Sequence, residues 1–579
     1  MTAATGISAR WYPPYRPVAA AGLLGGLAVL ILAPLAYLLV ASVTMDAGQA
    51  WWDVTRGPAS GALMWRPLGA SLAIAVAVGV LATAAGGLLA GLVVLTDLPG
   101  RTPLHFLICV PFLVPTFAVA MAWRAAVGNG RIGEADSLAA ALGLVTPDWL
   151  AWGPVPVVVV LVMHNTPIAY LLVAASLSTL RVEAVEAAKL AGAGVRRQVV
   201  SILLPMIKPA LLASGALCFA QAIGNFAAPA ILGPPVRFHT LSTRLFGMIE
   251  TGQTARGYAL AILLTLVAAL GVLIAFRLGL GRSGGAGMNR VAVHTPLYRL
   301  GRWRPPVAAG LHLGLALLAL VPVAVLVLSS LSATGDALAR GWTLHFWAGA
   351  ADPAVAEGQA GVLRTPAVYA ALGVTLALGA GAAVLAAALA LLTAMVARRI
   401  GGTALRAGLS TTLTLPLLVP SIALGAAFLA LYGGPIGPLP ALYGTFLLLL
   451  LIGVVALLPF AGQTAQVALA RLPTALEDAA RLAGANGWRR LTGIVLPLTA
   501  RALIAGALLN FVRLVRNLDL VVLVFTPVMP LLAVLAYRYA AEGFAQLAHA
   551  VAVLIVALSL IAAVAARLVE GRLTPEPRS

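Results

Sequence analysis

Two segments of the chain carry the same small and charged residues at the same spacing. Each has an acidic residue, two alanines, three further residues and a glycine, followed nine residues later by Ile-x-Leu-Pro. The acidic, alanine and glycine positions are Glu186, Ala187, Ala188 and Gly192 in the first copy and Asp478, Ala479, Ala480 and Gly484 in the second. A carboxylate can pair with a basic partner surface, alanines allow close helix contact, and glycine allows a turn that other residues avoid. The pattern fits either a surface that contacts a basic partner protein or an amphipathic surface hairpin, and it predicts no catalytic residue; the two copies are called the docking motifs.

A second set of polar residues lies within apolar stretches. In chain order these residues are Gln221, Asn225, Arg513, Arg516, Asn517 and Asp519. The first two correspond to Arg513 and Asn517 at the spacing of 292 residues that also separates the two docking motifs. Ionisable groups within a bilayer are costly and tend to line a path or to pair with one another. The residues are therefore candidates for a translocation path.

A structural interpretation of these polar residues is equally open. Arg516 could neutralise Asp519, three positions further along the same predicted helix. Gln221 and Asn225 could form hydrogen bonds across a helix interface. His164 has no second histidine near it in sequence, which favours a buried hydrogen-bonding residue over a metal ligand.

The sequence predicts neither an ATPase nor a bound cofactor. A phosphate-binding loop of the form G-x-x-x-x-G-K-[ST] requires a lysine followed by serine or threonine. The two lysines are Lys189, followed by Leu190, and Lys208, followed by Pro209. Cys109 and Cys218 lie in apolar runs, without the spacing of a thiolate metal site. We expect no metal site and no enzymatic activity in this chain.

The elements that must position these residues are membrane helices. The chain has 579 residues, is 61% hydrophobic and 9% charged, and has a mean hydropathy of +1.01. Crossing a bilayer takes about 20 apolar residues in a helix. Twelve such runs are predicted: Val18–Val43, Leu68–Leu95, Leu104–Val127, Val155–Thr179, Ala210–Leu232, Tyr258–Phe276, Val307–Ser329, Ala367–Val396, Leu405–Leu431, Leu442–Ala470, Ala502–Phe525 and Leu547–Ala566.

An internal repeat divides the runs into two homologous halves of six helices, residues 1–290 and 291–579, in an all-α membrane fold. The docking motifs fall in loops at about 181–207 and 473–499. The segments 111–115 (P-F-L-V-P) and 416–420 (P-L-L-V-P) also match, and their prolines could kink the helices or serve in gating. A further short or re-entrant segment near 137–150 is left open.

The net charge of +19 is unevenly distributed. The basic excess falls in the N-terminal segment, the C-terminal segment and the loops after even-numbered helices. Basic loops remain on the cytoplasmic side, so both termini and both docking motifs are predicted to be cytoplasmic. This distribution of charge is typical of a protein in a lipid bilayer, and we expect no nucleic-acid partner.

The docking motif resembles the EAA loop of ABC-importer permeases, with Asp478 in place of glutamate in the second copy. The resemblance implies two short helices joined at the glycine, which lie in a groove of an ATPase subunit. It also implies two copies of that ATPase, which bind the ATP and Mg, and an extracytoplasmic solute-binding protein. The expected location is the bacterial cytoplasmic (inner) membrane.

Shorter matches concern the cargo. H-N-T-P from His164, L-Y-G-T from Leu442 and L-P-F-A from Leu458 resemble ferric-iron and thiamine permeases. These matches favour ferric iron, with thiamine, polyamine or phosphonate as alternatives. Where iron permeases have E-x-L-x-D-F, this chain has Gln221 and Asn225, which weighs against a cationic cargo. Alternatives of another class are an ion-gradient-driven secondary transporter and a membrane scaffold.

Overall fold

The computed structural model describes residues 17–46, 48–132, 137–180, 183–279, 296–333, 341–399, 403–435 and 440–571. Within these ranges the regular structure is helical, apart from three isolated β-bridges. The two ends of the chain, 1–16 and 572–579, lie outside the described residues, as do positions 181–182 of the first docking loop.

Ten helices of the described chain are long and apolar enough to cross a membrane. Counting each of two sharply bent helix pairs as one span gives twelve, the number that the sequence predicts. The ten are α1 (Pro17–Thr44), α3 (Arg66–Leu95), α8 (Pro154–Ser178), α11 (Leu204–Ile223), α14 (Thr254–Gly279), α15 (Arg304–Ser330), α17 (Pro366–Arg399), α20 (Phe446–Ala470), α23 (Leu496–Val515) and α26 (Ala545–Gly571).

The two bent pairs correct the predicted spans Leu104–Val127 and Leu405–Leu431, which are not continuous helices. The pairs are α4 (Arg101–Leu113) with α5 (Thr116–Val127), bent by 90°, and α18 (Thr403–Thr414) with α19 (Ser421–Tyr432), bent by 104°. Pro115 and Pro420 immediately precede α5 and α19, and the residue before each proline is extended. Proline disfavours helical backbone in the preceding residue, so the helix breaks there in both halves.

The predicted spans Ala210–Leu232 and Ala502–Phe525 are also interrupted. The long helices α11 and α23 begin earlier than predicted, directly after π-helical turns at Val199–Leu203 and Leu491–Val495. They end at Ile223 and Val515, and the short helices α12 (Ala227–Leu232) and α24 (Leu518–Val521) follow. Arg516 and Asp519 therefore do not share one helix, contrary to the expectation from the sequence.

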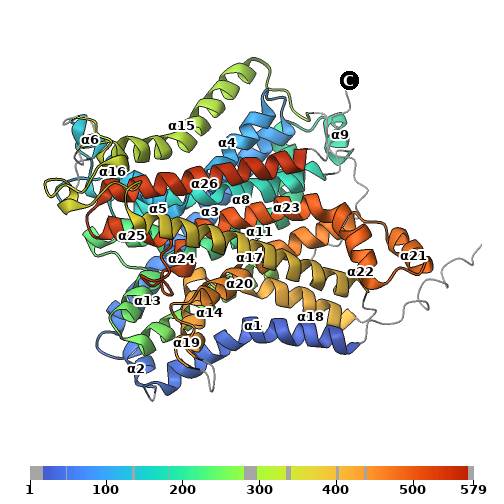
Figure 1. Cartoon of the computed structure of the whole chain (residues 1–579). Coiled ribbons are helices and arrows are strands. Elements are labelled where there is room, and N and C mark those ends of the chain that lie inside the picture. Colours follow the sequence, from blue (N-terminus) through green and yellow to red (C-terminus); the bar gives the residue numbers. More distant parts are fainter. Residues whose placement is uncertain are drawn as a thin grey trace, which may run out of the picture.

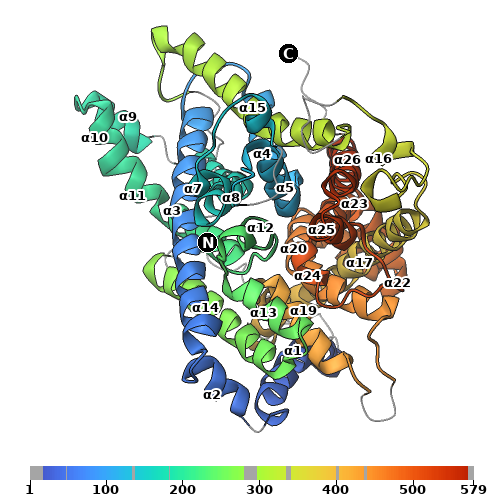
Figure 2. The same cartoon turned by 90° about the vertical axis from the view of Figure 1, so that its left-hand side faces the viewer.

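The two halves interlock through their first helices (Figure 2). Helix α1 packs along α18 and α19 of the second half, and α15 packs along α4 and α5 of the first. Within the halves, α3 packs on α8 and α11, and α17 packs on α20 and α23. Gly86 allows close approach of α3 to α8, because a Cβ there would lie 2.6 Å from the backbone nitrogen of Tyr170.

The docking loops lie at one end of the molecule (Figure 1). They contain α9 (Glu183–Leu190), α10 (Val195–Gln198), α21 (Thr474–Leu482) and α22 (Gly487–Arg490). Helix α1 begins and α26 ends at this same end. The opposite end carries α2 (Gln49–Thr55), α13 (Leu241–Glu250), α16 (His345–Ala348) and α25 (Leu532–Ala541).

The segment near 137–150, where the sequence allows a further short or re-entrant span, also lies at that opposite end. Its described residues form two four-residue helices, α6 (Leu138–Ala141) and α7 (Asp148–Ala151), which are too short to cross a membrane.

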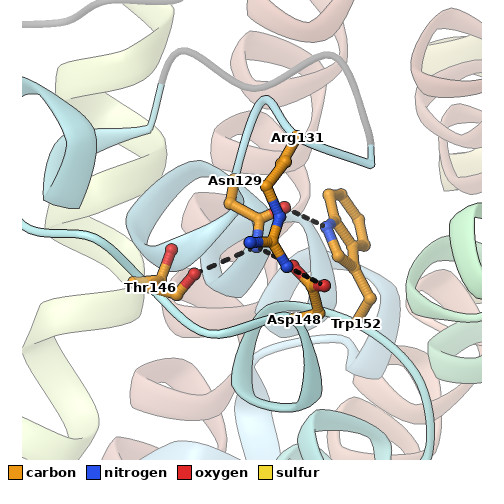
Figure 3. A network of polar contacts seen from close by, with 5 residues as sticks. All are labelled: Asn129, Arg131, Thr146, Asp148 and Trp152. Carbon is orange, nitrogen blue, oxygen red and sulfur yellow. Dashed lines mark hydrogen bonds and ion pairs between the residues drawn. The ribbon is translucent and has the colours of Figure 1, made fainter.

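A polar network organises this segment (Figure 3). Asp148 accepts hydrogen bonds from Asn129 at 2.8 Å and from Arg131 at 2.5 Å. The Asn129 side chain also donates to the Thr146 carbonyl and accepts from the Trp152 indole. These contacts join both ends of the segment, so the loop is folded on itself rather than inserted as a span.

Candidate functional site

A polar cavity of about 140 Å³ lies between the two halves. It is bounded by the helix breaks of both halves, including Pro115 and Thr116 from one and Pro420 and Ser421 from the other. All six predicted path residues line it: Gln221, Asn225, Arg513, Arg516, Asn517 and Asp519. The structure thus brings the predicted residues together, and their role in transport stays a prediction.

Two of these residues bind the first turns of short helices: Asn517 is the N-cap of α24, and Asn225 directly precedes the N-cap residue of α12. The Asn225 Oδ1 atom accepts a hydrogen bond from the backbone N–H of Ala228 at 3.1 Å, at the start of α12. The Asn517 Oδ1 atom accepts one from Leu520 at 3.2 Å, in α24. Asparagine is a favoured residue at helix N-termini because its side chain satisfies a backbone donor. The asparagines therefore fix the broken segments that line the cavity.

The same asparagines join these segments to the proline breaks. The Nδ2 atom of Asn225 donates to the hydroxyl of Thr116 at 3.3 Å, just after Pro115. In the second half, Nδ2 of Asn517 donates to Ser421 at 3.5 Å. Hydrogen bonding across helices, one of the two interpretations of Asn225, is thus present, and it coexists with a position on the cavity wall.

Asp519 connects the halves. Its Oδ1 atom accepts from the backbone N–H of Ala227 at 3.0 Å, and its Oδ2 atom accepts from Phe226 at 3.2 Å and from the Asn225 side chain at 3.3 Å. No ion pair joins Arg516 to Asp519 in the part of the chain that the structure describes. The suggested neutralisation of Asp519 by Arg516 is therefore replaced by three N–H donors from the first half.

The two arginines lie over aromatic rings. The Arg513 guanidinium carbon lies 3.3 Å from the centroid of the Phe460 ring, and that of Arg516 lies 4.0 Å from the centroid of Phe112. His164 stacks on Phe112, with ring centroids 5.3 Å apart. Phe112 was not singled out from the sequence, although it belongs to the P-F-L-V-P segment. Its counterpart in the second half, Leu417, has no aromatic ring.

The two docking loops have the geometry that the motif predicts. In each loop two short helices are joined at the motif glycine, and φ is 77° at Gly192 and 83° at Gly484. Side chains other than glycine rarely adopt this left-handed conformation. The motif does not predict two exposed leucines at matching positions of the repeat. Leu190 is 92% exposed and Leu482 is 90% exposed.

The first loop is fastened to the segment that connects the halves. Lys189 donates to the carbonyl of Leu297 and lies 4.9 Å from the centroid of the Tyr298 ring. The Tyr298 hydroxyl donates to Gln198 at 3.1 Å, and burial raises the pKa of this tyrosine. Both short helices of the loop therefore contact the same segment, residues 297–298.

The second loop is anchored by a different set of contacts. Arg398, near the end of α17, donates to the carbonyls of Leu469 and Leu472, at 2.9 Å and 3.1 Å. It also lies 3.8 Å from the carboxylate of Glu477, a buried residue whose counterpart in the first loop is the apolar Val185. The second loop is therefore held against the long helices of its own half.

A duplicated bundle of membrane-length helices with a polar cavity between its halves fits the class of membrane transport proteins. Residues 82–279 and 370–575 match the family described as the binding-protein-dependent transport system inner membrane component. The chain belongs to this family and carries its domain twice.

Three relatives agree with this assignment. A probable ABC transporter permease protein, y4fN of Sinorhizobium fredii, is 28% identical over 73% of this chain and 72% of its own. The sulfate transport system permease protein CysT of Salmonella typhimurium is 28% identical, over 42% of this chain and 83% of its own. The trehalose/maltose transport system permease protein MalF of Thermococcus litoralis is 30% identical, over 31% of this chain and 62% of its own.

The relatives are permease subunits of ABC transporters, a class of subunit that is not itself an enzyme. The chain is accordingly a multi-pass ABC importer permease subunit. Membership of a binding-protein-dependent family implies, in general, an ATPase partner and a solute-binding protein partner.

Proposed function

We propose that this chain forms the complete membrane pathway of an importer, in which a solute delivered by an external binding protein crosses through the cavity between the halves. The observation that carries the proposal is the position of this cavity, where the helix breaks of both halves meet. ATP and Mg are bound by the partner ATPase, with one copy at each docking loop. The loops transmit ATPase closure through the residues around Glu186 and Asp478.

The proposed orientation places both docking loops in the cytoplasm of a bacterium, with the chain in its inner membrane. The basic excess of these loops supports this orientation. So does the beginning of α1 and the end of α26 at the same end of the molecule. The loop around α6 and α7 then faces the external binding protein.

Membership of the family does not identify the transported solute. The names of the relatives mention sulfate in one case and trehalose or maltose in another. Ferric iron, thiamine, polyamine and phosphonate therefore stay candidate cargoes, which differ in charge and can be compared with the charge of the cavity.

The docking-loop assignment can be tested at the motif glycines. Replacing Gly192 and Gly484 together by valine should weaken ATPase association and abolish ATP-dependent uptake, because valine is strained at their positive φ values. Gly252, with φ of 79° and open space around it, lies away from both loops, and Gly252→Val is the matched control.

Intact association and uptake in the double variant would show that the loops do not couple the ATPase to the membrane. Uptake by the reconstituted chain alone, driven by a proton gradient without ATP, would instead indicate the ion-gradient-driven class of transporter.

A further inference from the structure

The positive charge of the cavity is not balanced. Two arginines, Arg513 and Arg516, line it together with a single carboxylate, that of Asp519. Both oxygens of this carboxylate already accept hydrogen bonds from the first half. His164, the remaining titratable group on the wall, supplies no negative charge. The wall therefore presents more cationic than anionic groups to whatever enters.

Burial of the Arg516 side chain costs free energy. The residue is only 9% exposed, and its Nη1 atom is buried without a hydrogen-bond partner among the described residues. An unsatisfied buried donor loses its hydration without compensation, and the loss is larger for a charged group. The aromatic face of Phe112 offsets part of this cost, because a ring attracts a cation but accepts no strong hydrogen bond.

The ring contacts leave guanidinium N–H groups available. The guanidinium carbons of Arg513 and Arg516 lie over the rings of Phe460 and Phe112, and a ring attracts a cation without accepting a strong hydrogen bond. The planar fork of guanidinium N–H groups matches oxygen pairs of carboxylates and tetrahedral oxyanions. The first half has Gln221 and Gly224 at the corresponding positions, so the cationic groups come from one half only.

We propose that the cavity binds a compact oxyanionic group of the cargo through Arg513 and Arg516, so that the solute carries a phosphonate, phosphate or sulfate-like group. This inference rests on the proposed function, because it takes the cavity as part of the path. Among the four candidate cargoes it selects phosphonate. A free ferric ion or a polyamine would meet two like charges, with no free carboxylate to bind it.

The test is a binding measurement on the full-length permease with its ATPase, without ATP. Methylphosphonate, sulfate and phosphate are titrated at constant ionic strength against the thermal unfolding midpoint, since a ligand of the folded state raises this midpoint. Putrescine and thiamine are the cationic probes. The variants are Arg516→Gln, Arg513→Gln and Arg516→Lys, and Arg364→Gln, an exposed arginine outside the cavity, is the matched control.

We expect saturable stabilisation by at least one oxyanion. Its apparent affinity should fall about tenfold or more in Arg516→Gln and Arg513→Gln, because a charge-assisted hydrogen bond is lost. It should fall less in Arg516→Lys, which keeps the charge and guards against a folding defect, and it should stay unchanged in Arg364→Gln.

Three results would overturn the inference: no saturable response of the wild-type complex to any of the oxyanions, equal responses in all variants, or saturable stabilisation by putrescine or thiamine. None of these depends on ATP coupling. Failure of the importer proposal would appear separately, as loss of ATP-dependent uptake with intact anion binding.

Discussion

At the scale of single residues, Asp519 has the most consequential contacts. It reaches from the second half to the backbone at the start of α12 in the first, where it accepts from Phe226 and Ala227. The sequence placed Asp519 near the path but suggested the wrong partner for it. Its true partners lie nearly 300 positions away, and no local pattern encodes a contact at that separation. The positive φ at Gly192 could be predicted, because a glycine in a repeated turn has a local cause.

Replacing Asp519 by asparagine should destabilise the protein. The amide keeps the size of the side chain but removes its charge and turns an NH₂ group toward backbone donors. We expect a loss of roughly 1.5–3 kcal/mol in the free energy of unfolding, the range for hydrogen bonds to charged groups. Thermal unfolding in detergent would measure it against Asp46→Asn, an exposed position. Equal unfolding midpoints for the two variants would mean that Asp519 does not join the halves.

At the scale of elements, apolar run length predicted twelve spans, the number obtained when each bent pair counts as one, and the proline kinks suggested by the sequence are complete helix breaks. Hydropathy averages over a window, so it does not distinguish a continuous helix from two helices bent by 90° or 104°. The signal was nevertheless present, because Pro115 and Pro420 recur in matching segments. Only the fold shows that both bends border the same cavity. The packing of α3 on α8 is a second property of elements that composition alone did not reveal.

This packing predicts different effects of alanine at two glycines of α3. Gly86→Ala should lower stability by about 1–3 kcal/mol, the usual cost of overpacking, because the new Cβ meets the backbone of Tyr170. Gly91→Ala should not destabilise, since nothing lies within 4 Å of the place that its new Cβ would occupy and alanine favours helix. Comparison of the two unfolding midpoints tests the prediction, which fails if Gly86→Ala is as stable as Gly91→Ala.

At the scale of the whole molecule, the two halves converge on one cavity and each presents one docking loop at the same end (Figure 1). The repeat and the loops were predictable because the motif is local and occurs twice. The interlocking of α1 and α15 with the opposite halves was not, because it depends on long-range packing between spans of similar composition. This interlocking joins the two halves through the packing of α1 and α15.

The exposed leucines at the loop tips predict where a partner subunit binds. Leu190→Ala and Leu482→Ala should each weaken ATPase association about tenfold, since burying an exposed leucine side chain at an interface contributes about 1.5–3 kcal/mol. Val145→Ala, equally exposed in the loop at the opposite end, should leave the affinity unchanged. Surface-immobilised permease titrated with ATPase would give the dissociation constants, and unchanged values for both leucine variants would exclude the loop tips as contacts.

We propose that a separate ATPase subunit drives this permease by moving its two docking loops relative to each other. This proposal is tested most directly by spin labels at Ala191→Cys and Ala483→Cys, exposed matching positions in the two loops, after replacement of Cys109 and Cys218 by serine. Pulsed electron resonance would report the distance between the labels in the reconstituted complex. We expect ATP binding to shorten this distance and hydrolysis to restore it, whereas a distance that is the same with and without ATP would contradict coupling through the loops.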